Sequence, residues 1–337
     1  MNMQALVIEK PRAACVRSVP VPPVGEQDIL IEVKASGICG TDAHIFRGEY
    51  LGTYPVIPGH EFSGVVAEAG AGVTRFVVGD RAAVEPNLAC GICPPCLSNR
   101  QNFCGRWSAL GVTRPGGMAA YAAVPEQAAF KLEKNLSFLE GAFMEPLSCV
   151  LHGLERAPVR FGDRVLVVGA GPMGLLLTQA ACLHGAGAVT QVDRNQSRLE
   201  RAQENGASQV RQSLEGLPQD SFDLVVDATG VPALMARAVD FARKGGAVLW
   251  FGAPPRDGKL ELPAFSIFEK GLSLVSSYTS ARNSLQALAL LETGKIRVSP
   301  LVSHTLPLAD FARAVELIET GRDNVLKVMI LPDSGGL

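Results

Sequence analysis

The sequence predicts an α/β protein in which a β-rich domain, made from both ends of the chain, is interrupted by a doubly wound parallel sheet. Residues 1–148 contain short apolar runs separated by Gly and Pro. In residues 149–283, apolar strands alternate with amphipathic helices, which is the pattern of a parallel sheet covered on both faces. Residues 284–337 bring further helical periodicity and a closing strand, which fits a return to the first domain. A length of 337 residues allows each domain its own core.

The β-rich part is predicted from apolar runs that are bounded by turn residues. Strands are expected at 28–37, 62–73, 76–86, 118–125 and 324–332. Two amphipathic helices are expected in the C-terminal part, at 280–296 and 308–321.

The middle of the chain has longer and more regular elements. Strands are expected at 163–171, 188–194, 222–230, 247–254 and 272–278. The helices between them are expected at 172–186, 195–207 and 231–246.

Composition excludes several classes of function. The formal net charge is −2 and no basic run is present, so neither a nucleic acid nor an anionic membrane surface is a favoured partner. The N-terminus lacks the pattern of a secretory signal, and no apolar stretch reaches the roughly 18–20 residues of a membrane span. We therefore expect a cytoplasmic protein, in which clustered cysteines bind metal rather than form disulfides.

The segment "VLVVGAGPMG" predicts a dinucleotide site. It places Gly169, Gly171 and Gly174, with Pro172 and Met173 between them, after a strand and at the start of a helix. The first glycine permits a tight turn, the second lets a pyrophosphate approach the backbone, and the third lets helix and strand pack closely. The free N–H groups at the helix start favour phosphate. The prediction is therefore a Rossmann domain, and a simple glycine turn is the alternative.

The residues after the next strand predict which dinucleotide is bound. Asp193 ends that strand, where an acidic side chain bonds the ribose hydroxyls of the adenosine half. A carboxylate repels a 2′-phosphate, so NAD is expected in preference to NADP. The adjacent Arg194 softens that preference. A helix-capping role for Asp193 is the alternative.

A four-cysteine loop, "CGICPPCLSNRQNFC", contains Cys90, Cys93, Cys96 and Cys104. Four thiolates at such short spacing can close a tetrahedral shell around Zn²⁺ and leave no open position, as in a structural site. Four unconnected thiols are one alternative. An iron–sulfur cluster is the other, but the spacing before the last cysteine differs from that of bacterial ferredoxins.

A second set of candidate metal ligands is spread over three segments. "GICGTDAHIF" supplies Cys39, "PGHEFSG" supplies His60 and Glu61, and "FMEPLSC" supplies Glu145. A thiolate, an imidazole and a carboxylate can hold Zn²⁺ with one position open for substrate, as a catalytic zinc requires. Taken singly, Cys39 could be a small core residue, His60 a turn residue and Glu145 a helix-start carboxylate.

These motifs together resemble the zinc-dependent medium-chain dehydrogenases, the superfamily of alcohol and sorbitol dehydrogenases. The resemblance runs through "GICGTDAH", "PGHEFSG", "VVGDRA", the four-cysteine loop, "EPLSC" and "VLVVGAGPMG", in family order. It implies a GroES-like catalytic domain, 1–148 with 284–337, an inserted NAD-binding Rossmann domain, 149–283, and catalysis in the cleft between them. It also implies two zinc ions per chain, a small alcohol as substrate, and a homo-oligomer, either a dimer or a tetramer.

Within the superfamily, Glu145 points to the sorbitol/polyol branch, because ethanol-type enzymes have cysteine at that position. There Cys39, His60 and Glu61 are expected to hold the zinc, with Glu145 bound directly or through water. One thiolate and two carboxylates would give a net charge of −1 around a dication, so we predict that Glu61 and Glu145 are not both tight ligands during turnover.

The resemblance also implies a proton relay and a substrate pocket. Thr41 and His44 match the hydroxyl and the imidazole that carry the alcohol proton to solvent. Arg114, Tyr50 and Tyr278 are candidate substrate contacts, and Arg114 is equally a plain surface residue. The arginine–tyrosine pair of sorbitol dehydrogenases is absent, because Ser277 precedes Tyr278; that departure counts against sorbitol itself.

The expected function is oxidation of a secondary hydroxyl of a polyol, sugar alcohol or sugar acid by hydride transfer to NAD. A threonine-type 2-amino-3-hydroxy acid dehydrogenase is the rival with the same chemistry. A non-catalytic zinc- and nucleotide-binding protein is the rival from another class, and a zinc-free quinone reductase would lack both metal sets.

Overall fold

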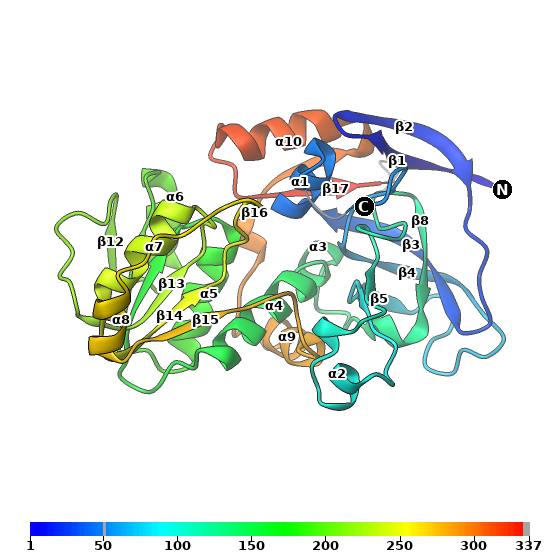
Figure 1. Cartoon of the computed structure of the whole chain (residues 1–337). Coiled ribbons are helices and arrows are strands. Elements are labelled where there is room, and N and C mark those ends of the chain that lie inside the picture. Colours follow the sequence, from blue (N-terminus) through cyan, green and yellow to red (C-terminus); the bar gives the residue numbers. More distant parts are fainter. Residues whose placement is uncertain (50–51, 333–337) are drawn as a thin grey trace. The chain divides into compact units, whose positions relative to one another are not determined.

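A computed structural model describes residues 1–49 and 52–332 (Figure 1). The chain divides into two compact units, and its course crosses between them twice. One unit is made of Met1–Ser148 together with the segment that starts at Ser280, and the other is Cys149–Thr279. None of the helices in the described part of the chain has the length and hydrophobicity needed to cross a membrane bilayer.

The first unit is built on a seven-stranded sheet with a helix pair near the C-terminus. The strands of this unit are β1 (Asn2–Lys10), β2 (Ala13–Pro20), β3 (Asp28–Gly37), β4 (Glu61–Ala69), β5 (Arg81–Val84), β6 (Asn87–Leu88), β7 (Ser108–Ala109), β8 (Tyr121–Pro125), β9 (Ala129–Lys131), β16 (Val302–Pro307) and β17 (Lys327–Leu331). The pairs β1–β2 and β6–β7 form two separate two-stranded sheets. The sheet order is β16-β17-β3-β4-β5-β9, and β8 also pairs with β3. The C-terminal β17 therefore lies directly beside β3 from the start of the chain (Figure 1).

Short helices complete this unit. They are α1 (Gly40–Arg47), α2 (Pro94–Leu97), α3 (Phe138–Gly141), α9 (Ser284–Glu292) and α10 (Phe311–Thr320), and α4 (Met144–Arg156) runs on into the second unit. Buried residues of β1, α1, α10 and β17 form one hydrophobic cluster, and those of β3, β4, β5 and β8 form another. The two ends of the chain are thus held in one unit by a shared core.

The second unit is a parallel sheet with helices between its strands. The strands are β10 (Arg164–Val168), β11 (Ala188–Val192), β12 (Gln209–Arg211), β13 (Phe222–Asp227), β14 (Ala242–Trp250) and β15 (Ser273–Ser276). The helices are α5 (Pro172–Leu183), α6 (Gln196–Glu204), α7 (Pro232–Phe241) and α8 (Ala264–Lys270). Every strand pair is parallel, and the order β12-β11-β10-β13-β14-β15 is the 3-2-1-4-5-6 order of the Rossmann fold. The predicted fold class is confirmed.

Several predicted elements end elsewhere. The helix predicted at 231–246 ends at Phe241, because Ala242 already pairs with Phe222 of β13 and Gly245 has a φ of +71°, which no α-helix accommodates. The helix predicted at 280–296 is confined to Ser284–Glu292. The hairpin β1–β2, the edge strand β12 and the helices α1 and α8 were not predicted.

The second crossing between the units lies between Thr279 and Ser280. The hydroxyls of Ser280 and Ser284 both donate to the carboxylate of Glu85, at 2.8 and 2.9 Å. Those bonds attach the returning chain to the first unit as soon as it arrives.

Candidate active site

The mixed set of metal ligands lies where three neighbouring strands come together. Gly37, the last residue of β3, pairs with Glu61 at the start of β4 on one side and with Met329 of β17 on the other. Cys39 follows β3 and His60 precedes β4, so strand pairing brings the two turns together. Ligand atoms of Cys39, His60 and Glu61 all lie within 4.8 Å of one another. Sulfur, nitrogen and oxygen at this separation suit Zn²⁺.

A buried carboxylate, Asp42, ties the two turns to each other. Cys39 caps the N-terminus of α1, and its backbone N–H donates to Asp42 Oδ2 at 2.9 Å. Asp42 Oδ1 accepts from the backbone N–H of Gly59 at 3.2 Å and lies 3.4 Å from Nδ1 of His60. Asp42 therefore faces one ring nitrogen of His60 and leaves the other for a metal, the arrangement usual for metal-binding histidines.

The electrostatics of this set fit a cation. Burial alone would lower the pKa of His60, but the negative charges of Asp42 and Cys39 outweigh it and hold that pKa well above its ordinary value. A positive charge between these groups is therefore stabilised. A proton can supply it, and so can a zinc ion bound to the thiolate and imidazole.

A buried lysine that sequence analysis missed completes the charge balance. Lys327, the first residue of β17, is 4% exposed, and its Nζ forms an ion pair with Oε2 of Glu61, which is 1% exposed. Burial would lower the Lys327 pKa, but Glu61, Cys39 and Glu145 outweigh it and raise the pKa, so the lysine is cationic. Gly37 makes room for the pair, since a Cβ there would lie 2.3 Å from Glu61 Oε2 and 2.9 Å from Lys327 Cε.

Glu145 lies in the first turn of α4 and is buried. The described ligand group within 4.8 Å consists of Cys39, His60 and Glu61 and does not include it. Its charge still acts on Lys327, so it belongs to the same electrostatic cluster. Adding the lysine changes the charge balance drawn from the sequence, because the −1 expected for a dication, one thiolate and two carboxylates becomes zero.

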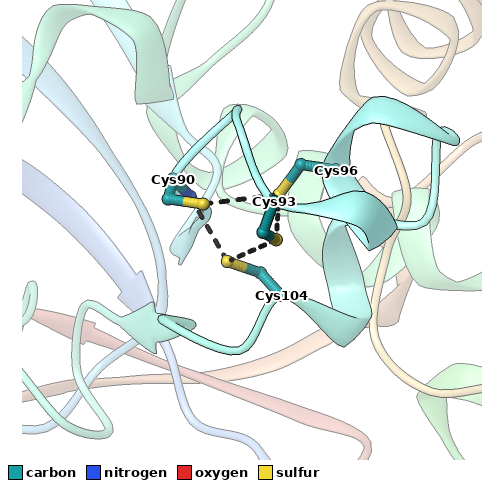
Figure 2. Close-up of side chains that lie close together, drawn as sticks. All are labelled: Cys90, Cys93, Cys96 and Cys104. Carbon is teal, nitrogen blue, oxygen red and sulfur yellow. Dashed lines mark hydrogen bonds between the residues drawn. The ribbon is translucent and has the colours of Figure 1, made fainter.

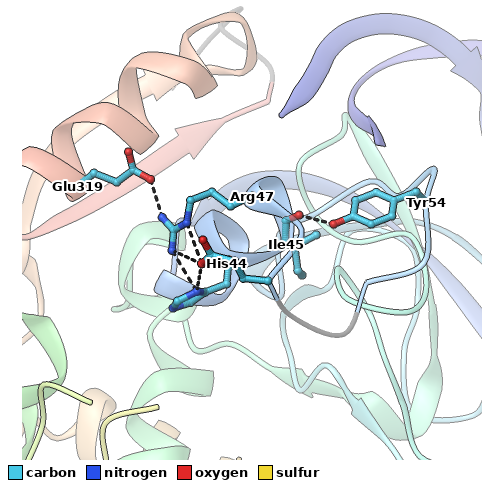
Figure 3. Close-up of polar contacts among 6 residues, drawn as sticks. His44, Ile45, Arg47, Tyr54 and Glu319 are labelled. Atoms are coloured by element: carbon cyan, nitrogen blue, oxygen red, sulfur yellow. Dashed lines mark hydrogen bonds and ion pairs between the residues drawn. The ribbon is translucent and has the colours of Figure 1, made fainter. Parts of the chain in front are cut away.

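The two predicted relay residues lie one turn apart on α1. Thr41 Oγ1 is 3.8 Å from the Cys39 thiol, so its hydroxyl adjoins the metal set. His44 is three residues further, a spacing that puts side chains on the same helix face. Its Nδ1 lies 2.8 Å from Glu49 Oε2 and 3.0 Å from Arg47 Nη2 (Figure 3).

The four-cysteine loop folds into a compact sulfur cluster (Figure 2). The Sγ atom of Cys93 lies 3.4 Å from Sγ of Cys96 and 3.8 Å from Sγ of Cys104. The Sγ atoms of Cys90 and Cys96 are 4.0 Å apart. A tetrahedron with Zn–S bonds of about 2.3 Å has edges of about 3.8 Å, so these separations suit zinc. All four cysteines are free of disulfide bonds.

Hydrogen bonds stabilise the negatively charged form of Cys90, which is the form that binds a metal cation. Hydrogen bonds from the Ile92 and Cys93 backbones and from Arg106 lower the Cys90 pKa from 9.0 to about 5. Burial and the neighbouring thiols raise the pKa of Cys96 to about 11. The raised pKa means that Cys96 is a thiol at neutral pH unless a positive ion stabilises its thiolate.

The glycine-rich turn has the geometry that a dinucleotide needs. Gly169 has a φ of +102°, and a Cβ on Gly174 would lie 2.0 Å from the Gly169 carbonyl oxygen. A Cβ on Gly171 would meet no atom within 4 Å, so the backbone there is open to a ligand. Gly171 is the N-cap of α5, and Pro172 and Met173 begin that helix.

Asp193 follows β11 and contacts the same turn. Its Oδ2 accepts from the backbone N–H of Ala170 at 2.8 Å, and its Oδ1 accepts from that of Asn195 at 2.9 Å. Arg194 is exposed beside it. Sequence analysis missed the fully buried Asp227, which ends β13 next to the turn and whose pKa is raised by burial. The signal was the acidic residue that directly follows the apolar run in "DLVVDATG".

The described structure places two of the three predicted substrate contacts, each in a different unit. Arg114 is exposed, on a loop whose Gly111 and Gly116 pack directly against Gly59, next to His60. Tyr278 follows β15 in the second unit and is 38% exposed. Tyr50 lies outside the described residues.

Comparison with known proteins identifies the family. Residues 25–134 match the alcohol dehydrogenase GroES-like domain, and residues 172–293 match the zinc-binding dehydrogenase domain. D-altritol 5-dehydrogenase of Agrobacterium fabrum is 38% identical over 90% of this chain and 92% of its own. This chain belongs to the zinc-dependent medium-chain dehydrogenase superfamily, in its polyol dehydrogenase-like branch.

Other members of the superfamily match along nearly the whole chain. L-threonine 3-dehydrogenase of Bacillus velezensis is 31% identical over 98% of this chain and 99% of its own. The crystal structure of a zinc-binding dehydrogenase of Sinorhizobium meliloti 1021, bound to NADP, has a TM-score of 0.94 at 33% identity and covers 98% of this chain and all of that one. The family resemblance noted in the sequence and the GroES-like and Rossmann folds are thereby confirmed.

Proposed function

We propose that this protein oxidises a secondary hydroxyl of a polyol, sugar alcohol or sugar acid to a ketone, with zinc and a nicotinamide dinucleotide. The observation that carries the proposal is the buried cluster of Cys39, His60 and Glu61, a mixed group of possible metal ligands in a member of this superfamily. The similarity to an altritol dehydrogenase supports a polyol as substrate.

We further propose two zinc ions per chain. Cys90, Cys93, Cys96 and Cys104 would hold a structural ion, for which the sulfur spacing is suitable. Cys39 and His60 would hold the catalytic ion. The ion pair with Lys327 favours Glu61 as the carboxylate held away from the metal. Glu145 is then the carboxylate available to bind, directly or through water.

The chemistry assigned to each residue follows from its position. A bound zinc ion supplies Lewis acidity that lowers the pKa of an alcohol. The Thr41 hydroxyl, which can both donate and accept, takes the alcohol proton, and His44 passes it towards solvent. Asp42 lies beside the His60 ring at ion-pair distance, and Lys327 adds one positive charge to the cluster. The domain assignment, with residues 149–283 binding the dinucleotide, belongs to this proposal.

NAD is the proposed cofactor, because Asp193 follows the second strand of the Rossmann sheet, where an acidic side chain bonds ribose hydroxyls and disfavours a 2′-phosphate. The solvent-exposed Arg194 and the NADP-bound relative are the observations that favour NADP. Steady-state kcat/KM values for NAD and NADP with the same alcohol distinguish the two, and a preference for NADP contradicts the assignment.

The second candidate is an L-threonine 3-dehydrogenase activity, which the match to the Bacillus velezensis enzyme supports. The decisive experiment is metal analysis followed by a screen of polyols, sugar acids, sugar phosphates and L-threonine. About two zinc ions per chain and NADH formation with a polyol are expected. Turnover of L-threonine alone favours the second candidate, and a protein that binds zinc and NAD but oxidises nothing contradicts both. A homo-oligomer and a cytoplasmic location stay predictions.

A further inference from the structure

The end of α1 returns an acidic residue to the side of the proposed relay histidine. Gly48 ends the helix with a φ of +83°, in the left-handed region that favours glycine. The chain then reverses, and the backbone N–H of Glu49 donates to the carbonyl oxygen of His44 at 2.9 Å. A side chain at Gly48 would also collide with Pro11, whose Cγ lies 2.7 Å from the Cβ position. The local fold therefore holds Glu49 beside His44.

A single carboxylate oxygen, Oε2 of Glu49, is the centre of the resulting cluster. Glu49 Oε2 lies 2.8 Å from His44 Nδ1, 2.9 Å from Arg47 Nε and 2.9 Å from Arg47 Nη2. The other guanidinium nitrogen, Arg47 Nη1, donates to Glu319 of α10 at 2.5 Å. Arg47 is thus held from both sides, by Glu49 on its own segment and by Glu319 on the C-terminal helix.

These contacts select one tautomer of the imidazole. Arg47 Nη2 is 3.0 Å from His44 Nδ1 and carries two hydrogens, so besides its contact with Glu49 it can donate to a bare Nδ1; that contact is longer than the 2.8 Å between Nδ1 and Glu49 Oε2. A carboxylate oxygen can only accept, so a bare Nδ1 at 2.8 Å would set two lone pairs against each other. Hydrogen on Nδ1 gives instead a charge-assisted bond to Glu49. The Nε2 lone pair is then free.

We propose that Glu49 is a positioning residue that holds His44 with its hydrogen on Nδ1, so that Nε2 accepts the proton released in alcohol oxidation. This inference rests on the proposed function. The proton leaves the substrate hydroxyl, passes through the Thr41 hydroxyl and binds Nε2 of His44. The resulting imidazolium carries a positive charge that the Glu49 carboxylate stabilises. Water or a buffer base then removes a proton from the ring and restores the starting tautomer.

The charged groups around His44 support this direction of transfer. Arg47 and Glu49 on its own segment and Glu319 on α10 are the charged side chains of this cluster, one positive and two negative. Hydrogen bonds to His44 and Arg47 lower the pKa of Glu49, which therefore stays an acceptor. Side-chain exposures of 32% for His44 and 48% for Glu49 give the proton a route to water.

The tautomer can be tested in the resting protein, independently of any activity. The full chain labelled with ¹⁵N-histidine has only five histidines, and His44→Gln assigns the His44 signals. At a pH where the ring is neutral, we expect the Nδ1–H form in the wild type and a mixture in Glu49→Gln, whose amide can accept or donate. An Nε2–H ring in the wild type, or the same Nδ1–H form in Glu49→Gln, overturns the proposal.

The consequence for turnover is tested by proton release, followed with an indicator dye in stopped flow. Because general acid–base transfer contributes roughly 10²–10⁴-fold, we expect Glu49→Gln to release the proton on the order of tenfold more slowly in weak buffer. Added imidazole should restore the rate of Glu49→Gln and leave the wild-type rate unchanged. A slow variant that no base rescues would show a merely structural role and overturn the proposal.

Glu9→Gln is the matched control. Glu9 on β1 forms an exposed ion pair with Arg17 on β2, in the same unit. Its replacement should alter neither the His44 tautomer nor the proton-release rate, and a change of either would overturn the assignment to Glu49. If the wild type oxidises no alcohol, the proposed function fails, while the NMR measurement still decides the tautomer.

Discussion

Replacing Lys327 with Met tests the buried charge balance at the metal set. The change removes the cation and leaves Glu61 as a carboxylate that is 1% exposed. Breaking a buried ion pair by removing one partner costs about 3–5 kcal/mol. At about 2–4 °C per kcal/mol for a unit of this size, the metal-free variant should melt roughly 6–20 °C below the wild type. The zinc-loaded variant should lose less, because the dication offers Glu61 a second counter-ion.

The assay is thermal unfolding of wild type, Lys327→Met, Glu61→Gln and the double variant, each with zinc and with chelator. Because Glu61→Gln removes the orphaned charge, the double variant should be more stable than Lys327→Met, with a coupling free energy above about 1 kcal/mol in the double-mutant cycle. Cobalt-substituted Lys327→Met should also show a changed visible spectrum, since the released carboxylate can bind the metal. A coupling free energy near zero in the metal-free protein would refute the reasoning.

Four further predictions concern the two metal sites and the cofactor. Glu145→Gln should retain two zinc ions by elemental analysis and lose roughly 10- to 100-fold in kcat, and full activity would contradict a role at the metal. Cys93→Ser should lower the zinc content to one ion per chain and lower the melting temperature. In the metal-free loop, the pKa of Cys90 is lowered from 9.0 to about 5. Its thiolate therefore contributes to stability fully above pH 9, and this contribution is lost as the pH falls to about 5. Thermal unfolding of the chelated protein over a series of pH values measures the loss. Asp193→Ser should raise the ratio of kcat/KM for NADP over NAD on the order of 10- to 100-fold, because a like-charge contact is removed, and an unchanged ratio would exclude Asp193 as the selector.

Much of the architecture could be predicted because its determinants are local in the sequence. The glycine spacing from Gly169 to Gly174 specifies a turn and a helix start within one short segment. The four cysteines lie within 15 consecutive positions, so their cluster needs only a loop of the right shape. The alternation of strands and helices specifies a parallel sheet, although the end of the helix at Phe241 depended on pairing with β13.

The sequence by itself determined the two-domain plan, the glycine-rich turn and the identity of the residue types able to bind zinc. Only the tertiary structure decided which of them meet, because β3 lies between β4 and β17 in the sheet and so brings Lys327 beside Glu61, 266 positions away in the chain. No local pattern encodes that pairing. It follows from strand order and register, and it adds one positive charge to an otherwise anionic set of side chains.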